Sequence, residues 1–297
     1  MQVVLTLVTP DLDSLENMLP HALEAMAGAG CSIQETDVLG DGAFDLVVEH
    51  GDPAVIRRAA DSAFERHPVD LCVQPLAGRR KRLLVADMDS TIINVECLDE
   101  LADFAGVKVE VAAITERAMR GEVEFESALR ERVAMLEGLP AADLARCYDE
   151  RVRLNPGART LVRTMAADGA RCVLVSGGFD AFTRRVAEAA GFHAERANRL
   201  LEANGALTGL VAEPILGRDA KLAALIEEAA LAGVDLADTL AVGDGANDLA
   251  MLQAAGLGVA YRAKPIVAAG ADARVDYADL TALLYFQGYT ADGFVTD

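Results

Sequence analysis

Two hydrophobic patterns divide the chain near residue 80. Up to residue 76 the apolar segments are short, and their residues either alternate with polar ones or recur at helical spacing. After residue 82, continuous apolar runs of three or four residues are separated by long helical stretches. The change predicts two folding units, and we expect the basic segment between them, Ala77–Arg82, to be a solvated linker.

The N-terminal unit, residues 1–76, has the pattern of a small α+β domain. Val3–Val8 reads as a strand, apolar residues then recur at helical spacing from Leu12 to Met26, and Phe44, Leu46 and Val48 alternate with polar neighbours. The full order of segments is βαββαβ, which predicts a ferredoxin-like fold. Its simplest role is structural or dimerising.

The second unit, residues 83–297, has the pattern of an α/β protein. Apolar strands that alternate with helices predict a Rossmann-like parallel sheet covered on both faces. Residues from about 97 to 153 lack any such run and predict a helical cap, inserted just after the first strand and placed to act as a lid. The runs that predict the sheet are Leu83–Ala86, Cys172–Val175, Leu240–Val242 and Leu257–Ala260.

Composition narrows the classes of function. The chain has 27 Lys and Arg against 47 Asp and Glu, so its formal net charge is −20, and a field of that sign repels nucleic acid and anionic membranes. The sequence has no uninterrupted apolar run of about 18 residues, so it predicts no membrane-spanning helix. No secretory signal is evident at the N-terminus. The 5 cysteines are odd in number and have no Cys-x-x-Cys spacing, which predicts free thiols in a reducing compartment. We therefore expect a cytoplasmic protein.

Polar residues follow three of the predicted strands at the edge where a parallel sheet binds ligands. The first strand runs into Asp87 and Asp89, the second into Ser176-Gly177-Gly178, and the third into Asp244 and Asp248. Residues two apart on an extended chain face the same side, so we expect the carboxylates of Asp87 and Asp89 to reach one ligand and all four to converge.

Four carboxylates at one edge predict a divalent cation, and hard oxygen ligands suit Mg²⁺. A carboxylate beside such a cation can attack phosphorus and form an aspartyl-phosphate. Alone, Ser176-Gly177-Gly178 reads as a turn and Lys221 as a solvated lysine. Next to the carboxylates, the serine and the glycine amides, at the start of a predicted helix, can hold phosphate oxygens.

The set DMDST, VSGGFD, a lysine and VGDGANDLAML resembles the four motifs of the haloacid dehalogenase (HAD) superfamily. The segments DMDSTIINVECLDELA, AMRGEVEFESALRERVAML and ANRLLEANGALTG extend the resemblance to phosphoserine phosphatases of the SerB type, over about residues 82–290. The resemblance implies hydrolysis of O-phospho-L-serine to L-serine and phosphate, the last step of serine biosynthesis, with Mg²⁺ and an aspartyl-phosphate intermediate.

The resemblance also implies roles for individual residues. Asp87 is expected to be the nucleophile and a Mg²⁺ ligand. Asp89 is expected to be the general acid and then the general base, with its main-chain carbonyl on the metal, and Asp244 the third protein ligand. Asp248 would orient Lys221 or a metal-bound water. The implied substrate-binding residues are Glu96 for the ammonium group, Arg132 for the carboxylate, Met119 and Phe125 as apolar lid residues, and Ser176, Gly177, Lys221 and Asn247.

The N-terminal unit is similar to an ACT-type module, a small amino-acid-binding fold found on enzymes of amino-acid metabolism. Its first turn, Thr9–Asp13, lacks the glycine that many ligand-binding members carry there. An amino-acid effector such as serine is therefore one hypothesis for this unit, and homodimerisation is the plainer one.

Two other functions remain open from the sequence. A phosphotransferase of the same superfamily would pass the phosphoryl group to another hydroxyl acceptor. A regulatory sensor would bind an amino acid through residues 1–76 while its phosphatase half had lost activity. The presence of Asp87, Asp89, Lys221 and Asp244 speaks against the sensor.

Overall fold

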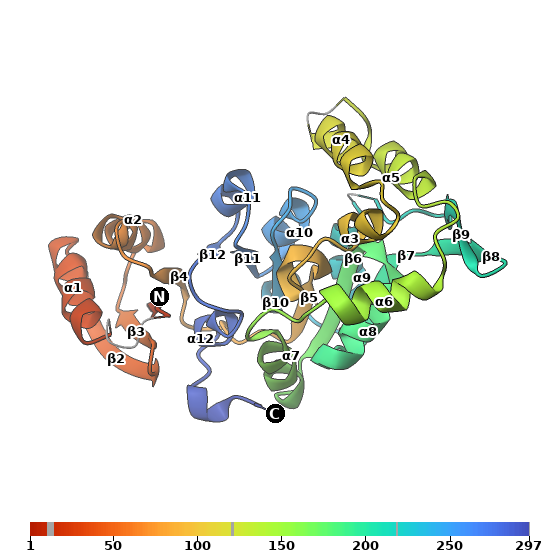
Figure 1. The fold of residues 1–297 in the computed structure, drawn as a ribbon. Coiled ribbons are helices and arrows are strands. Elements are labelled where there is room, and N and C mark those ends of the chain that lie inside the picture. The colour runs from red at the N-terminus through yellow and green to blue at the C-terminus, as the bar shows by residue number, and fades with distance from the viewer. Residues whose placement is uncertain (11–14, 120–121, 218, 297) are drawn as a thin grey trace.

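A computed structural model describes residues 1–10, 15–119, 122–217 and 219–296. Two large sheets organise these residues: the N-terminal one lies at the left of the view in Figure 1, and the larger one lies in the middle of the molecule. The N-terminal sheet is antiparallel, and the larger sheet is parallel with helices on both sides. The predicted fold class is confirmed.

The N-terminal sheet has the strand order β2-β3-β1-β4. Leu5, Phe44 and Leu46 point toward the helices and form a core with Ile56 and Met26. Pro53 at the first turn and Asp52, which accepts a hydrogen bond from the Ala54 N–H, begin the second helix. The elements are β1 (Val3–Val8), α1 (Leu15–Gly28), β2 (Ile33–Gly40), β3 (Ala43–Val48), α2 (Pro53–Phe64) and β4 (Asp70–Pro75).

The second face of this sheet is covered by the C-terminal segment of the chain. Helix α12 (Ala282–Phe286) lies against β1, between the two sheets (Figure 1). The Gln74 amide donates to the Phe286 carbonyl at 2.6 Å. Asp70, which is 2% exposed, accepts hydrogen bonds from the N–H groups of three successive residues, 276–278. The central strands β1 and β3 are therefore buried on both faces, whereas β2 at the edge is mostly exposed.

Four of the six residues in the basic segment 77–82 are exposed, as expected for a solvated linker, but Arg79 and Lys81 are not. Lys81 is 6% exposed, and its Nζ donates to the Gly78 and Ala237 carbonyls. Arg79 forms an ion pair with the fully buried Asp45. Ala237 and Asp45 are distant from this segment in the chain, so local composition could not reveal these two contacts.

The parallel sheet has the strand order β12-β11-β10-β5-β6-β7, which puts β5 beside β10 and β6. Leu84 and Leu174 face one helical layer, whereas Val85 and Val173 face the other. The strands are β5 (Leu83–Ala86), β6 (Arg171–Phe179), β7 (Ala194–Asn198), β10 (Thr239–Gly243), β11 (Leu257–Tyr261) and β12 (Ala273–Val275). The helices are α7 (Ala158–Ala167) and α8 (Asp180–Ala190) with α12 on one face, and α9 (Ala220–Ala232), α10 (Leu249–Ala254) and α11 (Pro265–Gly270) on the other.

The helical stretch after β5 forms a cap beside the carboxyl edge of the sheet (Figure 1). Its two connections to the sheet pair with each other, because Ile93 and Leu154 form a β-bridge and the Asn94 N–H donates to the Arg153 carbonyl. The cap helices are α3 (Cys97–Phe104), α4 (Lys108–Met119), α5 (Phe125–Ala134) and α6 (Ala142–Arg151).

A hairpin that the sequence analysis did not predict joins the cap to the sheet. Strands β8 (Leu200–Ala203) and β9 (Ala206–Val211) are antiparallel and meet at a turn in which Asn204 and Gly205 both have positive φ. The backbone of β9 pairs with the loop between α5 and α6 through the Pro140–Ala206 bridge. The cap therefore rests on this hairpin as well as on its own connections.

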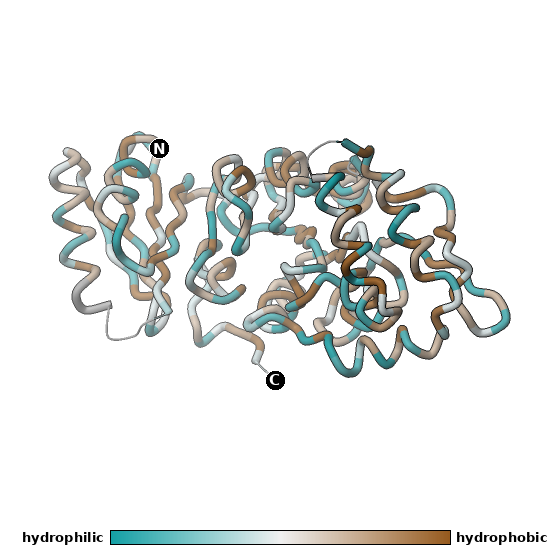
Figure 2. The backbone as a smooth tube through the Cα atoms, turned by 45° about the horizontal axis from the view of Figure 1, so that its top comes forward, coloured by the Kyte–Doolittle hydropathy of each residue, from teal (hydrophilic) through white to brown (hydrophobic). Residues whose placement is uncertain are grey.

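The hydropathy of the helices agrees with their packing on the sheets. In Figure 2 the helices alternate between hydrophobic and hydrophilic residues along their turns, as expected for helices that pack one face on a sheet. Within the described ranges, no helix is both long and apolar enough to cross a membrane.

Candidate active site

A buried lysine joins two carboxylates at the carboxyl edge of the parallel sheet. Asp87 directly follows β5 and is 5% exposed. Lys221, the second residue of α9 and 3% exposed, places its Nζ 2.6 Å from Oδ1 of Asp87. The same Nζ donates to Oδ1 of Asp248, which is fully buried. Lys221 therefore neutralises part of a buried negative charge and holds both carboxylates in place.

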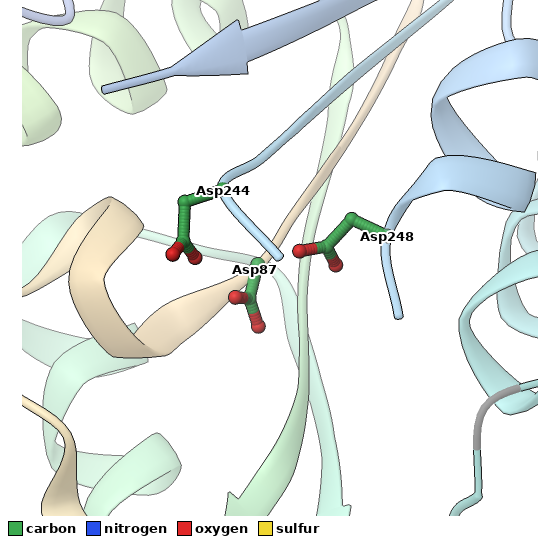
Figure 3. Close-up of side chains that lie close together, drawn as sticks. All are labelled: Asp87, Asp244 and Asp248. Carbon is green, nitrogen blue, oxygen red and sulfur yellow. The ribbon is translucent and has the colours of Figure 1, made fainter. Parts of the chain in front are cut away.

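A third carboxylate faces this pair. Asp244 follows β10, and its side chain points toward Asp87 and Asp248 (Figure 3). Each of the three offers an oxygen, and these oxygens lie within 4.8 Å of one another. A side chain at position 243 would overlap the Asp248 carboxylate, so Gly243 permits this close approach. The cluster is a candidate site for a divalent cation.

The electrostatics of the cluster favour a cation. Burial raises the pKa of Asp87 well above its usual range, and the charge of Asp248 adds to that rise while Lys221 opposes it. Burial, with the charge of Asp248, raises the pKa of Asp244 to about 6. Burial alone would lower the pKa of Lys221, but the charges of Asp248 and Asp87 raise it. One ammonium group among three carboxylates leaves negative charge that a bound cation would stabilise.

Asp89 does not join the cluster, which corrects the expected convergence of four carboxylates. Its Oδ1 accepts a hydrogen bond from the Cys97 N–H at 2.9 Å, at the first turn of α3, and its Oδ2 accepts one from Ser176 Oγ at 3.2 Å. Asp87 and Asp89 both have extended backbone angles, but Met88 between them is helical, so the extended geometry that the prediction assumed is interrupted at Met88. Burial, followed by the charge of Glu96, raises the pKa of Asp89 to about 6.

Ser176, Gly177 and Gly178 lie within β6 rather than at the start of a helix, so that part of the prediction is wrong. Helix α8 begins only at Asp180. The pairing of β6 with β7 shifts after Val175, which lets the chain continue extended. Ser176 Oγ accepts a hydrogen bond from the Gly178 N–H at 2.8 Å. A Cβ on Gly178 would lie 2.8 Å from Oδ2 of Asp89, so a side chain there would displace the Asp89 carboxylate.

Asn198, at the end of β7, is a site residue that the sequence analysis did not single out. It is 2% exposed. Its Nδ2 donates to the Gly177 carbonyl at 2.9 Å, and its Oδ1 accepts from the Leu216 N–H at 2.7 Å. Asn198 thus ties the glycine segment of β6 to the segment that precedes Lys221. The only signal in the sequence was its place inside the ANRLL motif.

Glu96 and Arg132 contact groups of the protein itself. Glu96 is exposed, and its Oε1 accepts a hydrogen bond from Ser90 Oγ at 2.6 Å. Arg132 donates from Nε to the Ala128 carbonyl at 3.3 Å and from Nη1 to Thr115 Oγ1 at 3.5 Å. Burial lowers the pKa of Arg132, and the charges of Asp99 and Glu96 oppose that effect. The charge of Glu96, the side chain named for the ammonium end of the substrate, therefore acts on Arg132, the one named for the carboxylate end.

The remaining predicted residues differ in how closely they approach the cluster. Phe125 begins α5, and its Cζ would lie 3.5 Å from a Cβ on Gly177. Asn247 is half-buried directly before Asp248. Met119 is the last residue of α4, and its side chain lies outside the described part of the chain.

Comparisons with known proteins agree with this geometry. A family model of haloacid dehalogenase-like hydrolases matches residues 84–253. A phosphoserine phosphatase of Streptomyces coelicolor is 41% identical over 296 residues, which cover 94% of this chain and 71% of that protein.

Two solved structures are similar in fold. A HAD-family hydrolase of Salmonella enterica has a TM-score of 0.84 and 29% identity, over 97% of this chain and 98% of that one. A structure described as a phospho-aspartyl intermediate analogue of phosphoserine phosphatase has a TM-score of 0.65 and 40% identity, over 70% of this chain and 99% of that one. The parallel sheet, its acidic edge and these matches lead to one conclusion: the chain belongs to the haloacid dehalogenase-like hydrolase family.

Proposed function

We propose that this chain is a phosphoserine phosphatase, which hydrolyses O-phospho-L-serine to L-serine and phosphate as the last step of serine biosynthesis. The observation that carries the proposal is the buried contact of Lys221 with Asp87 and Asp248 at the sheet edge. The sequence identity to a phosphoserine phosphatase over nearly the whole chain supports this choice of substrate.

In the first step, an Asp87 carboxylate oxygen attacks phosphorus and the bond from phosphorus to the serine oxygen breaks. The departing oxygen takes a proton from Asp89, and an aspartyl-phosphate forms. Burial supports this role for Asp89, because a carboxyl whose pKa is about 6 remains partly protonated near neutral pH. Lys221 and the N–H groups near Ser176 would stabilise charge on the phosphate oxygens.

In the second step, a water molecule gives a proton to Asp89 and attacks phosphorus. The bond from phosphorus to Asp87 breaks, phosphate leaves, and Asp89 is again protonated for the next turnover. The same side chain thus serves as acid and then as base. Its hydrogen bonds from Cys97 and Ser176 keep it beside the reaction instead of within the acidic cluster.

We propose Mg²⁺ as the cofactor, held by Asp87, Asp244 and the main-chain carbonyl of Asp89. The donor chemistry fits, because all these ligands are hard oxygens and Mg²⁺ shares its sites with phosphate. Asp248 is already held by Lys221 and by the Gly245 N–H, which supports a role for it outside the metal's direct ligands. When bound, the cation would neutralise the charge that keeps a phosphate dianion away from Asp87.

The specificity for serine is proposed to come from Glu96 and Arg132 in the cap, with Met119 and Phe125 excluding water and Asn247 contacting the substrate. Arg can bind a carboxylate through two parallel hydrogen bonds. Arg132 now donates to Ala128 and Thr115, so binding of the substrate carboxylate must replace those longer contacts.

For the rest of the chain we propose an ACT-like unit at 1–76, a connecting segment at 77–82 and a phosphatase unit at 83–297. Homodimerisation through the N-terminal unit, and an amino-acid effector there, are further proposals. Part of the first turn of that unit, residues 11–13, lies outside the described residues. A cytoplasmic location stays a prediction.

The test is phosphate release from L-phosphoserine, with Mg²⁺ and with EDTA, and with a second alcohol added as acceptor. We expect equal amounts of serine and phosphate, dependent on Mg²⁺, and no phosphorylated alcohol. Transfer to the alcohol would instead indicate a phosphotransferase. Absence of release from protein shown to be folded by circular dichroism would contradict the proposal.

A further inference from the structure

An ion pair links the cap to the segment behind the active site. Arg130, in the middle of α5, places its Nη2 2.8 Å and its Nε 3.3 Å from Oε1 of Glu213. Glu213 follows β9 and belongs to the sheet-bearing part of the chain. The pair therefore joins the cap to the segment that leads from the hairpin back to the sheet-bearing part of the chain.

On the sheet side, the segment of Glu213 is fixed at both ends to the two residues at the end of β7, Asn198 and Arg199. The Ala212 N–H donates to the Arg199 carbonyl at 2.8 Å, and the Leu216 N–H donates to Oδ1 of Asn198 at 2.7 Å. Asn198 also holds the carbonyl of Gly177, and the chain continues from Leu216 to Lys221 within five residues. A contact to Glu213 is therefore a contact to the frame that positions the phosphate-binding groups.

On the cap side, two residues at the start of α5, Phe125 and Glu126, approach that frame. Oε1 of Glu126 would lie 3.3 Å from a Cβ on Gly217, and Phe125 approaches Gly177. Glu126 and Arg130 are four residues apart and share one helical face. This face of α5 lies against the segment before Lys221.

The other end of α5 is held by backbone contacts to the hairpin. The Gly138 N–H donates to the Leu207 carbonyl at 2.9 Å, and the Leu207 N–H donates to the Leu139 carbonyl at 2.8 Å. A Cβ on Gly209 would lie 3.2 Å from the carbonyl oxygen of Ala134, so the strand and the helix end are in close contact. Arg132 lies between this fixed end and the ion pair.

We infer that the ion pair of Arg130 with Glu213 is a positioning contact that holds α5 over the active site and thereby sets the reach of Arg132 toward the substrate carboxylate. The inference rests on the proposed function and deepens it, because it makes specificity for phosphoserine depend on a contact outside the substrate site. An alkyl or aryl phosphate without a carboxylate should be far less sensitive to it.

The test is charge reversal of each partner and of both. R130E places a third carboxylate beside Glu126 and Glu213, and we expect kcat/KM for phosphoserine to fall about tenfold, mainly through KM. For p-nitrophenyl phosphate we expect a change of about twofold or less. The double variant R130E/E213R restores the opposite charges, and kcat/KM for phosphoserine should return to within about twofold of the wild type.

The matched control is E131A, which removes the ion pair of Glu131 with Arg117. That pair is similarly exposed but joins two helices of the cap, so it should not change the preference between the two substrates. The inference is overturned if R130E leaves the preference unchanged, if the double variant is no better than R130E, or if E131A has the same effect.

Amide hydrogen exchange of residues 125–134 tests the contact without any turnover. We expect faster exchange in R130E than in the wild type and recovery in R130E/E213R. If the wild type does not hydrolyse phosphoserine, the proposed function fails, while the exchange rates still decide whether the ion pair holds α5. Equal exchange in all three proteins would overturn the positioning role.

Discussion

The sheet edge and the cap differ in how their polar groups are satisfied. At the sheet edge, Asp87, Lys221 and Asp248 are buried and already contact one another. At the cap, Glu96 is exposed and bound to Ser90, and Arg132 is bound to the carbonyl of its own helix. The side chains proposed for phosphoryl transfer therefore contact one another before a substrate binds. The side chains proposed to select the substrate contact other groups of the protein instead.

This difference has a physical cause. The carboxyl ends of parallel strands align through the hydrogen bonds of the sheet, independently of the position of the cap. The paired strands β5 and β10 therefore hold Asp87 and Asp244 side by side. The positions of Glu96 and Arg132 depend instead on cap helices that contact the sheet through side chains, the paired connections and the hairpin. Changes at the sheet edge should thus affect every substrate, and changes in the cap should affect phosphoserine above all.

Asp87→Asn removes the proposed nucleophile and tests the sheet edge. A neutral amide cannot form the acyl-phosphate, so kcat should fall on the order of 10⁴-fold or more for phosphoserine and for p-nitrophenyl phosphate alike. Steady-state phosphate release measures the effect, and circular dichroism serves as the control for folding. Turnover near the wild-type rate would remove Asp87 from the nucleophile's role.

Replacing the buried Lys221 should lower the stability of the folded protein, because it leaves buried carboxylates without a positive partner. Lys221→Met leaves Asp87 and Asp248 buried without their ammonium partner, so the free energy of unfolding of the metal-free protein should fall by about 3–5 kcal/mol. Urea denaturation in EDTA measures this. Lys264→Met, at an exposed lysine outside these contacts, is the control and should change stability little. A loss below about 0.5 kcal/mol for Lys221→Met would contradict the preassembled pair.

Arg132→Ala tests whether the cap determines the preference for phosphoserine. Loss of the group proposed to bind the carboxylate should lower kcat/KM for phosphoserine by about 100-fold, and for p-nitrophenyl phosphate by only a few-fold. The ratio of the two kcat/KM values is the measurement. Equal losses on both substrates would assign Arg132 to the general architecture of the cap instead of to specificity.

The smallest expected effect is a dependence of stability on pH. Asp244 has its pKa raised from 3.8 to about 6 in the folded metal-free protein, so the folded state binds more protons than the unfolded state between these values. Stability must then fall as the pH rises through that window, by roughly 1–2 kcal/mol from this residue after allowance for solvent screening.

The control for that effect is Asp244→Asn, which keeps the other titrating groups. Denaturation of both proteins in EDTA from pH 4 to pH 6.5 isolates the contribution of Asp244. The wild type should lose more stability than the variant over this range, and added Mg²⁺ should reduce the difference in slope. Parallel curves would contradict the raised pKa.

Much of the fold could be predicted, because buried parallel strands have a distinctive local pattern. Leu83–Ala86 and Leu240–Val242 are apolar on both faces, and both are strands in the parallel sheet. The hairpin was missed although its turn, Asn204-Gly205, is a known signal for two residues with positive φ. Its strands are short, and β8 is mostly exposed, so hydrophobic alternation there is weak.

The site could be predicted down to the residues that follow each strand, but not to the direction of each side chain. Asp89 accepts hydrogen bonds from Cys97 and Ser176 because Met88, between Asp87 and Asp89, is not extended. Asn198 acts through backbone groups on two other segments, a role that its residue type does not reveal. Such features depend on contacts between segments far apart in the chain, which local patterns do not encode.

The central claim is that the phosphoryl group passes through Asp87 at the preassembled sheet edge. Trapping with sodium borohydride during turnover tests it directly, because the reagent reduces an aspartyl-phosphate to homoserine and marks that position in a peptide mass spectrum. With phosphoserine and Mg²⁺, we predict the mark at Asp87, and no mark in EDTA. A mark at Asp89 or Asp244, or full turnover with no marked residue at all, would contradict the account.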